Sequence, residues 1–105
     1  MFGRPARSRD RYFTVLFRPS EDQQRSRLGV VVSRKAERRA VGRNRLKRLV
    51  RESFRLHQSQ LDGMDLVVLA KPGTASGTNG ELRASLTIHW QRAADASTKR
   101  RPDWS

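Results

Sequence analysis

The segment from Val41 to Phe54, VGRNRLKRLVRESF, constrains the fold most, because apolar and basic residues alternate along it with helical spacing. This periodicity predicts a helix from Arg43 to about Leu61 with one buried face and one solvated face. The residues predicted to lie on the buried face, at steps of three and four, are Leu46, Leu49, Val50, Ser53, Phe54, His57 and Leu61.

The opposite face of this helix is strongly basic, with Asn44, Lys47, Arg48, Arg51 and Arg55. Between Arg34 and Arg55, ten basic residues are interrupted only by Glu37 and Glu52. An ordinary solvated face alternates its charges so that i,i+4 pairs form, whereas like charges at this spacing repel one another. We therefore predict that an external polyanion neutralises this face, and the planar guanidinium group suits phosphate oxygens.

Composition limits the class of protein. The 105 residues fit one domain, and 23 basic against 10 acidic residues give a net charge of +13, which attracts nucleic acid or an anionic membrane. No apolar run reaches the roughly 18 residues of a membrane span, and the N-terminus lacks a signal-peptide core, so we expect a cytoplasmic protein. With no cysteine and only two histidines, we expect no protein-held metal.

The remaining elements predict an α+β domain over residues 1–95, followed by a disordered basic tail over 96–105. RYFTVLF (11–17) and RLGVVVS (27–33) are predicted to be strands that pair as an antiparallel hairpin. The apolar run LVVLA (66–70) is typical of a strand covered on both faces. Residues 71–80 are predicted to form a loop, and residues 81–95 a helix with Leu82, Leu86, His89, Trp90 and Ala93 on its inner side.

The segments RLGVVVSRKAERRA, VGRNRLKRLVRESFRLHQ and MDLVVLAKPG together resemble the protein subunit of bacterial ribonuclease P over about Arg27 to Trp90. The resemblance implies a two-layer sandwich with α-β-β-β-α-β-α topology and a left-handed crossover through the basic helix. Family members begin with an additional helix, and Met1 and Phe2 stand where it would end. We therefore expect the first helix to be absent or truncated here.

The resemblance also implies a function. Family members bind a catalytic RNA and help it remove the 5′ leader of precursor tRNA, while the RNA holds Mg²⁺ and performs the hydrolysis. No catalytic residue, metal ligand, membrane or protein partner is implied for the chain itself. Carried over by position, the residues expected to face the catalytic RNA are Arg34, Lys35, Arg38, Arg39, Arg43, Asn44, Arg45, Lys47, Arg48 and Arg51.

The family's leader-binding cleft would correspond to a face of the first predicted strand. Alternation along this strand puts Phe13 and Phe17 on one face and Tyr12 on the other. An exposed aromatic ring on a sheet can stack on an unpaired base, although aromatic residues in strands more often belong to the core. The sequence therefore gives Tyr12, Phe13 and Phe17 as candidates for leader contacts without choosing among them.

Three alternatives are open at the level of sequence. The first is another structural RNA-binding protein, such as a ribosomal protein, in which Asn44 would matter little. The second is a self-sufficient nuclease, which needs a general acid and base or metal-binding carboxylates. His57, His89, Asp62 and Asp65 are the candidates, and core or turn roles are commoner for residues at such positions. A membrane-surface helix fits least, since the apolar face is needed for the core.

Overall fold

The computed structural model describes residues 6–20 and 26–100, with side chains described as far as Ala96. Four strands and two long helices form the domain, joined by two short 3₁₀ helices, η1 and η2. In chain order the elements are β1 (Ala6–Arg9), β2 (Phe13–Pro19), β3 (Arg27–Val31), α1 (Ala40–Leu56), η1 (Gln58–Leu61), β4 (Met64–Ala70), η2 (Pro72–Ser76) and α2 (Asn79–Arg100).

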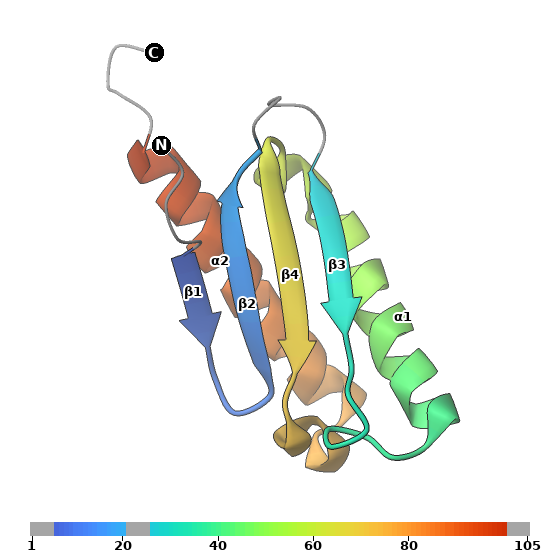
Figure 1. Ribbon diagram of the computed structural model, residues 1–105. Coiled ribbons are helices and arrows are strands. Elements are labelled where there is room, and N and C mark those ends of the chain that lie inside the picture. Colours follow the sequence, from blue (N-terminus) through green and yellow to red (C-terminus); the bar gives the residue numbers. More distant parts are fainter. Residues whose placement is uncertain (1–5, 21–25, 101–105) are drawn as a thin grey trace.

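The strands form one sheet with the order β1-β2-β4-β3 (Figure 1). β2 is antiparallel to β1 and β4, whereas β3 is parallel to β4. The predicted hairpin between the strands at 11–17 and 27–33 is wrong, because β4 inserts between them. A strand distant in sequence can outcompete a neighbour when its apolar face completes the sheet, and β4 brings Leu66 and Val68 to the core.

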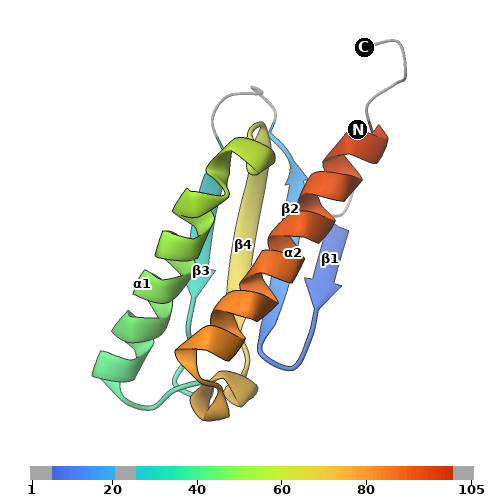
Figure 2. The same cartoon turned by 180° about the vertical axis from the view of Figure 1, so that it is seen from behind.

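The connection from β3 through α1 to β4 is a left-handed crossover. Viewed from the helix side, the chain runs down β3, up α1 in front of the sheet and down β4, which lies to the right of β3 (Figures 1 and 2). Parallel crossovers are right-handed in about 98% of cases. This rare feature, together with the strand and helix order, confirms the topology implied by the family resemblance for all elements after its first helix.

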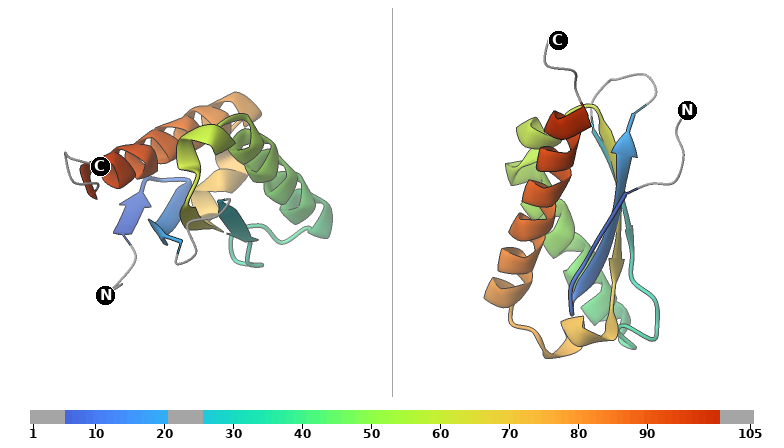
Figure 3. Two further views of the ribbon diagram at one scale, coloured as in Figure 1. Left: turned by 90° about the horizontal axis from the view of Figure 1, so that it is seen from above. Right: turned by 90° about the vertical axis from the view of Figure 1, so that its left-hand side faces the viewer.

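Both helices cover the same face of the sheet, and no helix of residues 6–20 or 26–100 lies on the other face (Figure 3). The core lies between the two layers, where Phe13, Val15, Leu66 and Val68 meet the inner sides of α1 and α2. Val67, on the uncovered face, is 37% exposed. The prediction that the 66–70 run is covered on both faces is therefore wrong, because both helices lie on one side of the sheet.

The two helices are joined through Trp90 of α2, which is completely buried. Its indole Nε1 donates a hydrogen bond of 2.8 Å to the Ser53 hydroxyl on α1, and its ring meets Phe54 edge-on at 5.7 Å between centroids. The hydroxyl satisfies a polar group that would otherwise be buried without a partner. Both predicted helical faces are confirmed in this packing, with Leu46, Leu49, Val50, Leu82, Leu86 and Ala93 also buried.

The boundaries of several elements differ from the predictions. α1 begins at Ala40 and ends at Leu56, and the chain reaches the buried Leu61 through η1. α2 continues to Arg100, past the predicted start of the tail at residue 96, and residues 101–105 lie outside the described part. The edge strand β1 was not predicted from periodicity because it is only four residues long. The described residues begin at Ala6, so the prediction about the first helix, at Met1 and Phe2, lies outside them.

Candidate nucleic-acid interface

The outer face of α1 carries an open groove in which four of the six lining residues are cationic. The groove is lined by Asn44, Lys47, Arg48, Arg51, Glu52 and Arg55. Arg48, Arg51 and Arg55 are exposed, and in the described part of the chain none of these arginines pairs with a carboxylate. The structure thus brings together Asn44, Lys47, Arg48 and Arg51 from the predicted set, on a rigid helix that opposes the core.

Arg43 is directed differently from the other arginines of this segment. Its Nη1 donates to the backbone carbonyls of Glu37, at 3.1 Å, and Arg38, at 2.8 Å. These bonds fasten the β3–α1 connection to the first turn of α1, which has no acidic residue. In this geometry Arg43 holds the neighbouring basic residues in position. Its Nη1 group is already hydrogen-bonded to backbone carbonyls.

Arg45 leaves the α1 groove and reaches the start of α2. Its Nη1 donates a hydrogen bond of 2.6 Å to the Asn79 side-chain oxygen, across 34 residues of sequence. Thr78 and Glu81 form a reciprocal capping box at the same helix start, with Glu81 N–H donating to the Thr78 hydroxyl and Thr78 N–H donating to the Glu81 carboxylate. The guanidinium of Arg45 is therefore oriented by α2 and stays exposed.

The β3–α1 connection extends the basic surface beyond the helix. Arg34, Lys35, Arg38 and Arg39 are all exposed, while the Ser33 carbonyl accepts hydrogen bonds from the backbone N–H groups of Ala36 and Glu37. In Figure 1 this connection lies at the same end of the molecule as the start of α1. The four predicted cations thus lie on the connection that leads into α1, on a turn that is ordered by its own backbone.

The uncovered face of the sheet forms a second surface suited to a polynucleotide. Strand register places Arg7, Leu16, Val67 and Gly29 in one row across the sheet, and Arg9, Thr14, Leu69 and Val31 in the next. Val31 is 50% exposed. Each row runs from an arginine on β1 across a strip of apolar and small side chains, so cations border a surface against which bases can pack.

Phe13 and Phe17 do not belong to this surface. Phe13 is completely buried and Phe17 is 5% exposed, because both rings point toward the helices. Of the three aromatic candidates for leader contacts, these two therefore lie in the core and not on the uncovered face, since periodicity identifies a shared face but not which face is covered. Tyr12, immediately before the first residue of β2, is half-buried. The Arg11 guanidinium lies 5.5 Å from the centroid of its ring.

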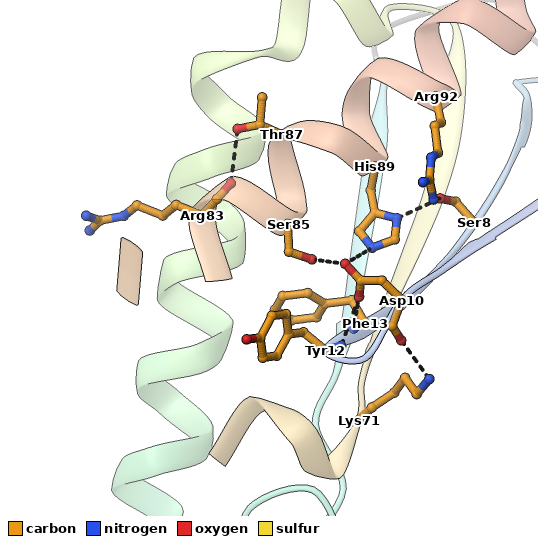
Figure 4. A network of polar contacts seen from close by, with 10 residues as sticks. All are labelled: Ser8, Asp10, Tyr12, Phe13, Lys71, Arg83, Ser85, Thr87, His89 and Arg92. Atoms are coloured by element: carbon orange, nitrogen blue, oxygen red, sulfur yellow. Dashed lines mark hydrogen bonds and ion pairs between the residues drawn. The ribbon is translucent and has the colours of Figure 1, made fainter. Parts of the chain in front are cut away.

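Asp10 organises a polar cluster beneath the β1–β2 turn (Figure 4). Its Oδ1 accepts hydrogen bonds of 2.9 Å from the backbone N–H groups of Tyr12 and Phe13, and its Oδ2 accepts one from the Ser85 hydroxyl. Oδ2 also lies 3.3 Å from Nε2 of His89. The carboxylate therefore fixes the hairpin turn and attaches it to α2.

His89 completes an arrangement that superficially resembles a catalytic Ser-His-Asp set. Its Nδ1 lies 2.7 Å from the Ser8 hydroxyl, which also accepts a bond from Arg92 Nη1 at 3.1 Å. The Asp10 carboxylate, 3.3 Å from Nε2, favours a proton on that nitrogen, which leaves Nδ1 to accept from the Ser8 hydroxyl. His89 is completely buried and Ser8 is 5% exposed, so no substrate reaches the serine. The cluster is structural.

The two titratable groups of this cluster have shifted pKa values. Burial opposes ionisation of Asp10, yet the hydrogen bonds from Ser85, Phe13 and Tyr12 and the nearby His89 together lower its pKa to about 2. Burial lowers the pKa of His89, and the attraction of Asp10 offsets this only in part. The folded protein therefore holds an ionised carboxylate against a neutral imidazole at neutral pH.

We expect the free energy of unfolding to fall as the pH is lowered from 7.5 to 5.5. Unfolding restores the ordinary pKa of His89, 6.5, so the unfolded chain takes up a proton below that pH more readily than the folded one. Urea titrations across this range measure the effect, and His89→Gln should flatten it. An unchanged pH dependence in His89→Gln would show that another group is responsible. Loss of the Asp10 contribution follows only between about pH 4 and 2.

The other acid–base candidates have local structural roles. His57 Nδ1 donates a hydrogen bond of 2.9 Å to the Ser53 carbonyl. The Oδ2 atom of Asp65 lies 4.0 Å from Nε of Arg18, its neighbour across the β2–β4 pair. Among the described residues, no three His, Cys, Asp or Glu side chains gather as metal ligands would. Within the same part of the chain, no helix combines the length and the apolar character needed to cross a membrane.

Several residues of these surfaces were not predicted from the sequence. Arg7 and Arg9 alternate with Ala6 and Ser8, a period of two that would have marked β1 and its exposed side had a four-residue strand been considered. Asn79 has no local signal, because its contact with Arg45 exists only once α2 lies beside α1.

Comparison with known proteins gives consistent matches. The family model described as Ribonuclease P matches residues 1–94. The ribonuclease P protein component of Acinetobacter baylyi is 52% identical over 77% of this chain and 61% of its own length, and that of Methylococcus capsulatus is 48% identical over 86% and 70%. The chain spans about 61 to 65% of the first few such relatives.

Solved structures agree with the sequence matches. The RNase P protein from Thermotoga maritima has a TM-score of 0.74 at 34% identity, covering 84% of this chain and 83% of that one. The RNase P protein of Staphylococcus aureus has a TM-score of 0.76 at 31% identity, covering 86% and 81%. These matches favour the family implied by the basic helix over a ribosomal protein. The chain therefore belongs to the ribonuclease P protein family.

Proposed function

We propose that this chain is the protein component of ribonuclease P and binds the catalytic RNA through the outer face of α1. The observation that carries this proposal is the groove whose arginines have no carboxylate partner in the described structure. Phosphates can replace the missing counter-charges, since each guanidinium offers a planar fork of donors. Asn44 adds a side chain able to bond a base edge or a ribose hydroxyl within the same groove.

The chemistry of the described side chains assigns the protein an accessory role. Its one His-carboxylate cluster is buried, and its exposed surfaces present arginines and lysines. Arginine stays protonated and is unsuited to act as a general base. Hydrolysis of the leader phosphodiester is thus left to the RNA subunit and the Mg²⁺ that it holds, and the protein supplies electrostatic stabilisation and positioning.

The uncovered sheet face is the proposed site for the single-stranded 5′ leader of precursor tRNA. Arg7 and Arg9 border an apolar strip on β2, β4 and β3, which suits a flexible strand whose phosphates need cations and whose bases need a surface to pack on. This assignment replaces Phe13 and Phe17. We further propose that the protein acts in the cytoplasm with RNA as its sufficient partner.

A cleavage assay tests the proposal. Precursor tRNA would be incubated with the matching catalytic RNA at low Mg²⁺, with and without the protein. We expect the protein to increase cleavage strongly and to cleave nothing alone, and its affinity for the catalytic RNA to fall steeply as salt rises. Cleavage by the protein without RNA, or no gain on adding it, would contradict the proposal.

A further inference from the structure

A second groove lies between α1 and α2, on the side of the helices away from the sheet. It is lined by Glu52, Ser53, Arg55, Leu56 and His57 from α1, and by Arg83 and Thr87 from α2. Figure 4 shows Arg83 and Thr87 on α2. None of the residues from α2 was among those predicted to bind RNA.

The polar groups inside this groove are largely committed already. The Ser53 hydroxyl accepts from Trp90, and the Thr87 hydroxyl donates to the Arg83 carbonyl at 3.0 Å. His57 Nδ1 must carry the proton when it bonds the Ser53 carbonyl, so Nε2 of the neutral ring is an acceptor. What the groove still offers a ligand is one imidazole nitrogen, two guanidinium groups and the aliphatic side chain of Leu56. It also contains one carboxylate, Glu52, so the two guanidinium groups leave the lining with a net positive charge.

Leu56 is 82% exposed. A single exposed leucine is ordinary on a protein surface and indicates nothing alone. Here, however, it lies in a groove with Arg55 and Arg83, neither of which has an ion pair in the described structure. An apolar side chain that shares a groove with two unpaired cations matches the chemistry of a nucleotide, which has a flat apolar base face and anionic phosphates.

The groove is also continuous with the proposed RNA surface. Glu52 and Arg55 line both this groove and the one along the outer face of α1. An RNA strand whose phosphates follow Arg48 and Arg51 therefore reaches Arg55 at the entrance to the second groove.

We propose that the α1–α2 groove receives one unstacked nucleotide of the catalytic RNA. Its base packs on Leu56, its phosphates are bound by Arg55 and Arg83, and His57 Nε2 accepts a hydrogen bond from a base N–H or a 2′-hydroxyl. This inference rests on the proposed function and adds a specific subsite to it, one that reads an unpaired position of the RNA and not the helical backbone alone.

The test measures affinity of the matching catalytic RNA for four single variants and, in parallel, for Arg48→Gln, which reports on the groove along the outer face of α1. Leu56→Ser removes the apolar contact and Arg83→Gln removes one cation. The matched controls are Ile88→Ser, at an apolar residue 49% exposed on α2 outside the groove, and Arg11→Gln, at an exposed arginine on the β1–β2 turn. All four positions are solvent-accessible, so melting temperatures should stay close to that of the parent protein.

We expect Leu56→Ser to weaken binding about 5- to 10-fold without changing the salt dependence, because a base contact is not ionic. Arg83→Gln should lower the slope of log K against log salt by about 0.7 to 0.9. Both controls should bind within about 2-fold of the parent, a change too small to represent a lost contact. Chemical probing should reveal one unpaired base that is protected by the parent protein and reactive with Leu56→Ser.

The outcomes separate this inference from the proposed function. If Leu56→Ser and Arg83→Gln bind like their controls while Arg48→Gln binds weakly, the subsite is rejected and the proposed function stands. If Leu56→Ser weakens binding but no base changes reactivity, the occupant is not an unstacked base. If Arg48→Gln also binds like the parent protein, the proposed function itself fails.

Discussion

Replacing Arg48 and Arg51 together by glutamine is expected to weaken binding of the catalytic RNA by about 100-fold at moderate salt, with the fold intact. Hydrogen bonds to charged groups contribute about 1.5 to 3 kcal/mol each, and about 1.4 kcal/mol corresponds to a tenfold change in affinity. The loss of two phosphate contacts therefore accounts for a change of about 100-fold or more. Both side chains are exposed on the outer face of α1 and contribute nothing to the core. Filter binding across a salt series measures the effect.

Thermal melting provides the control for this variant. Arg48, Arg51 and Arg55 are spaced three and four residues apart on one helix, where like charges destabilise it. Neutralising two of them should leave the melting temperature unchanged or slightly higher. Arg11→Gln, which also removes one exposed cation, should change RNA affinity much less per charge. An equal loss of RNA affinity per removed charge in Arg11→Gln and in the variant at Arg48 and Arg51 would mean that binding follows net charge and not this groove.

The second large effect is expected on stability. Trp90→Ala should lower the free energy of unfolding by about 3 to 5 kcal/mol, because it opens a cavity between α1, α2 and the sheet and removes the ring that meets Phe54. Small domains are stable by only about 5 to 15 kcal/mol, so the variant should be partly unfolded at physiological temperature. Urea unfolding followed by circular dichroism measures the loss.

A double-mutant cycle separates the hydrogen bond from the packing. Trp90→Phe leaves the buried Ser53 hydroxyl without its donor, and Ser53→Ala leaves the indole N–H without its acceptor. Each single change should cost about 1 to 3 kcal/mol for the group left unsatisfied. Trp90→Phe should cost more, because it also removes the packing of the indole. The double variant should be more stable than the sum predicts by about 1 kcal/mol. Strict additivity would show that the bond contributes little.

The sequence predicted best those features that depend on local periodicity. The basic and apolar faces of α1 follow from residue spacing, and both were confirmed by the burial of Leu46 and the exposure of Arg48. The same holds for the inner side of α2, including the buried His89. Helical periodicity is informative because a helix exposes one continuous stripe to a core, whichever element lies opposite.

Strand pairing and the orientation of individual side chains were not predictable in the same way. Alternation showed that Phe13 and Phe17 share a face, but only the position of both helices showed that this face is buried. Arg43 and Arg45 have similar sequence neighbours, yet one binds the backbone of its own connection and the other binds Asn79 of α2. The Arg43 contact is local but depends on the path of the β3–α1 connection, whereas the Arg45 contact joins residues 34 positions apart in the chain.

By itself the sequence determined that one helix joins a cationic surface to an apolar core, and its motifs indicated the family. Only the tertiary structure decided the β1-β2-β4-β3 order and the uncovered sheet face, while the left-handed crossover was implied by the family resemblance and not by residue spacing. It also decided the α1–α2 groove, whose lining residues come from both helices. The physical reason is that spacing along a chain specifies which residues share a face, whereas the partner of each face is set by non-local packing.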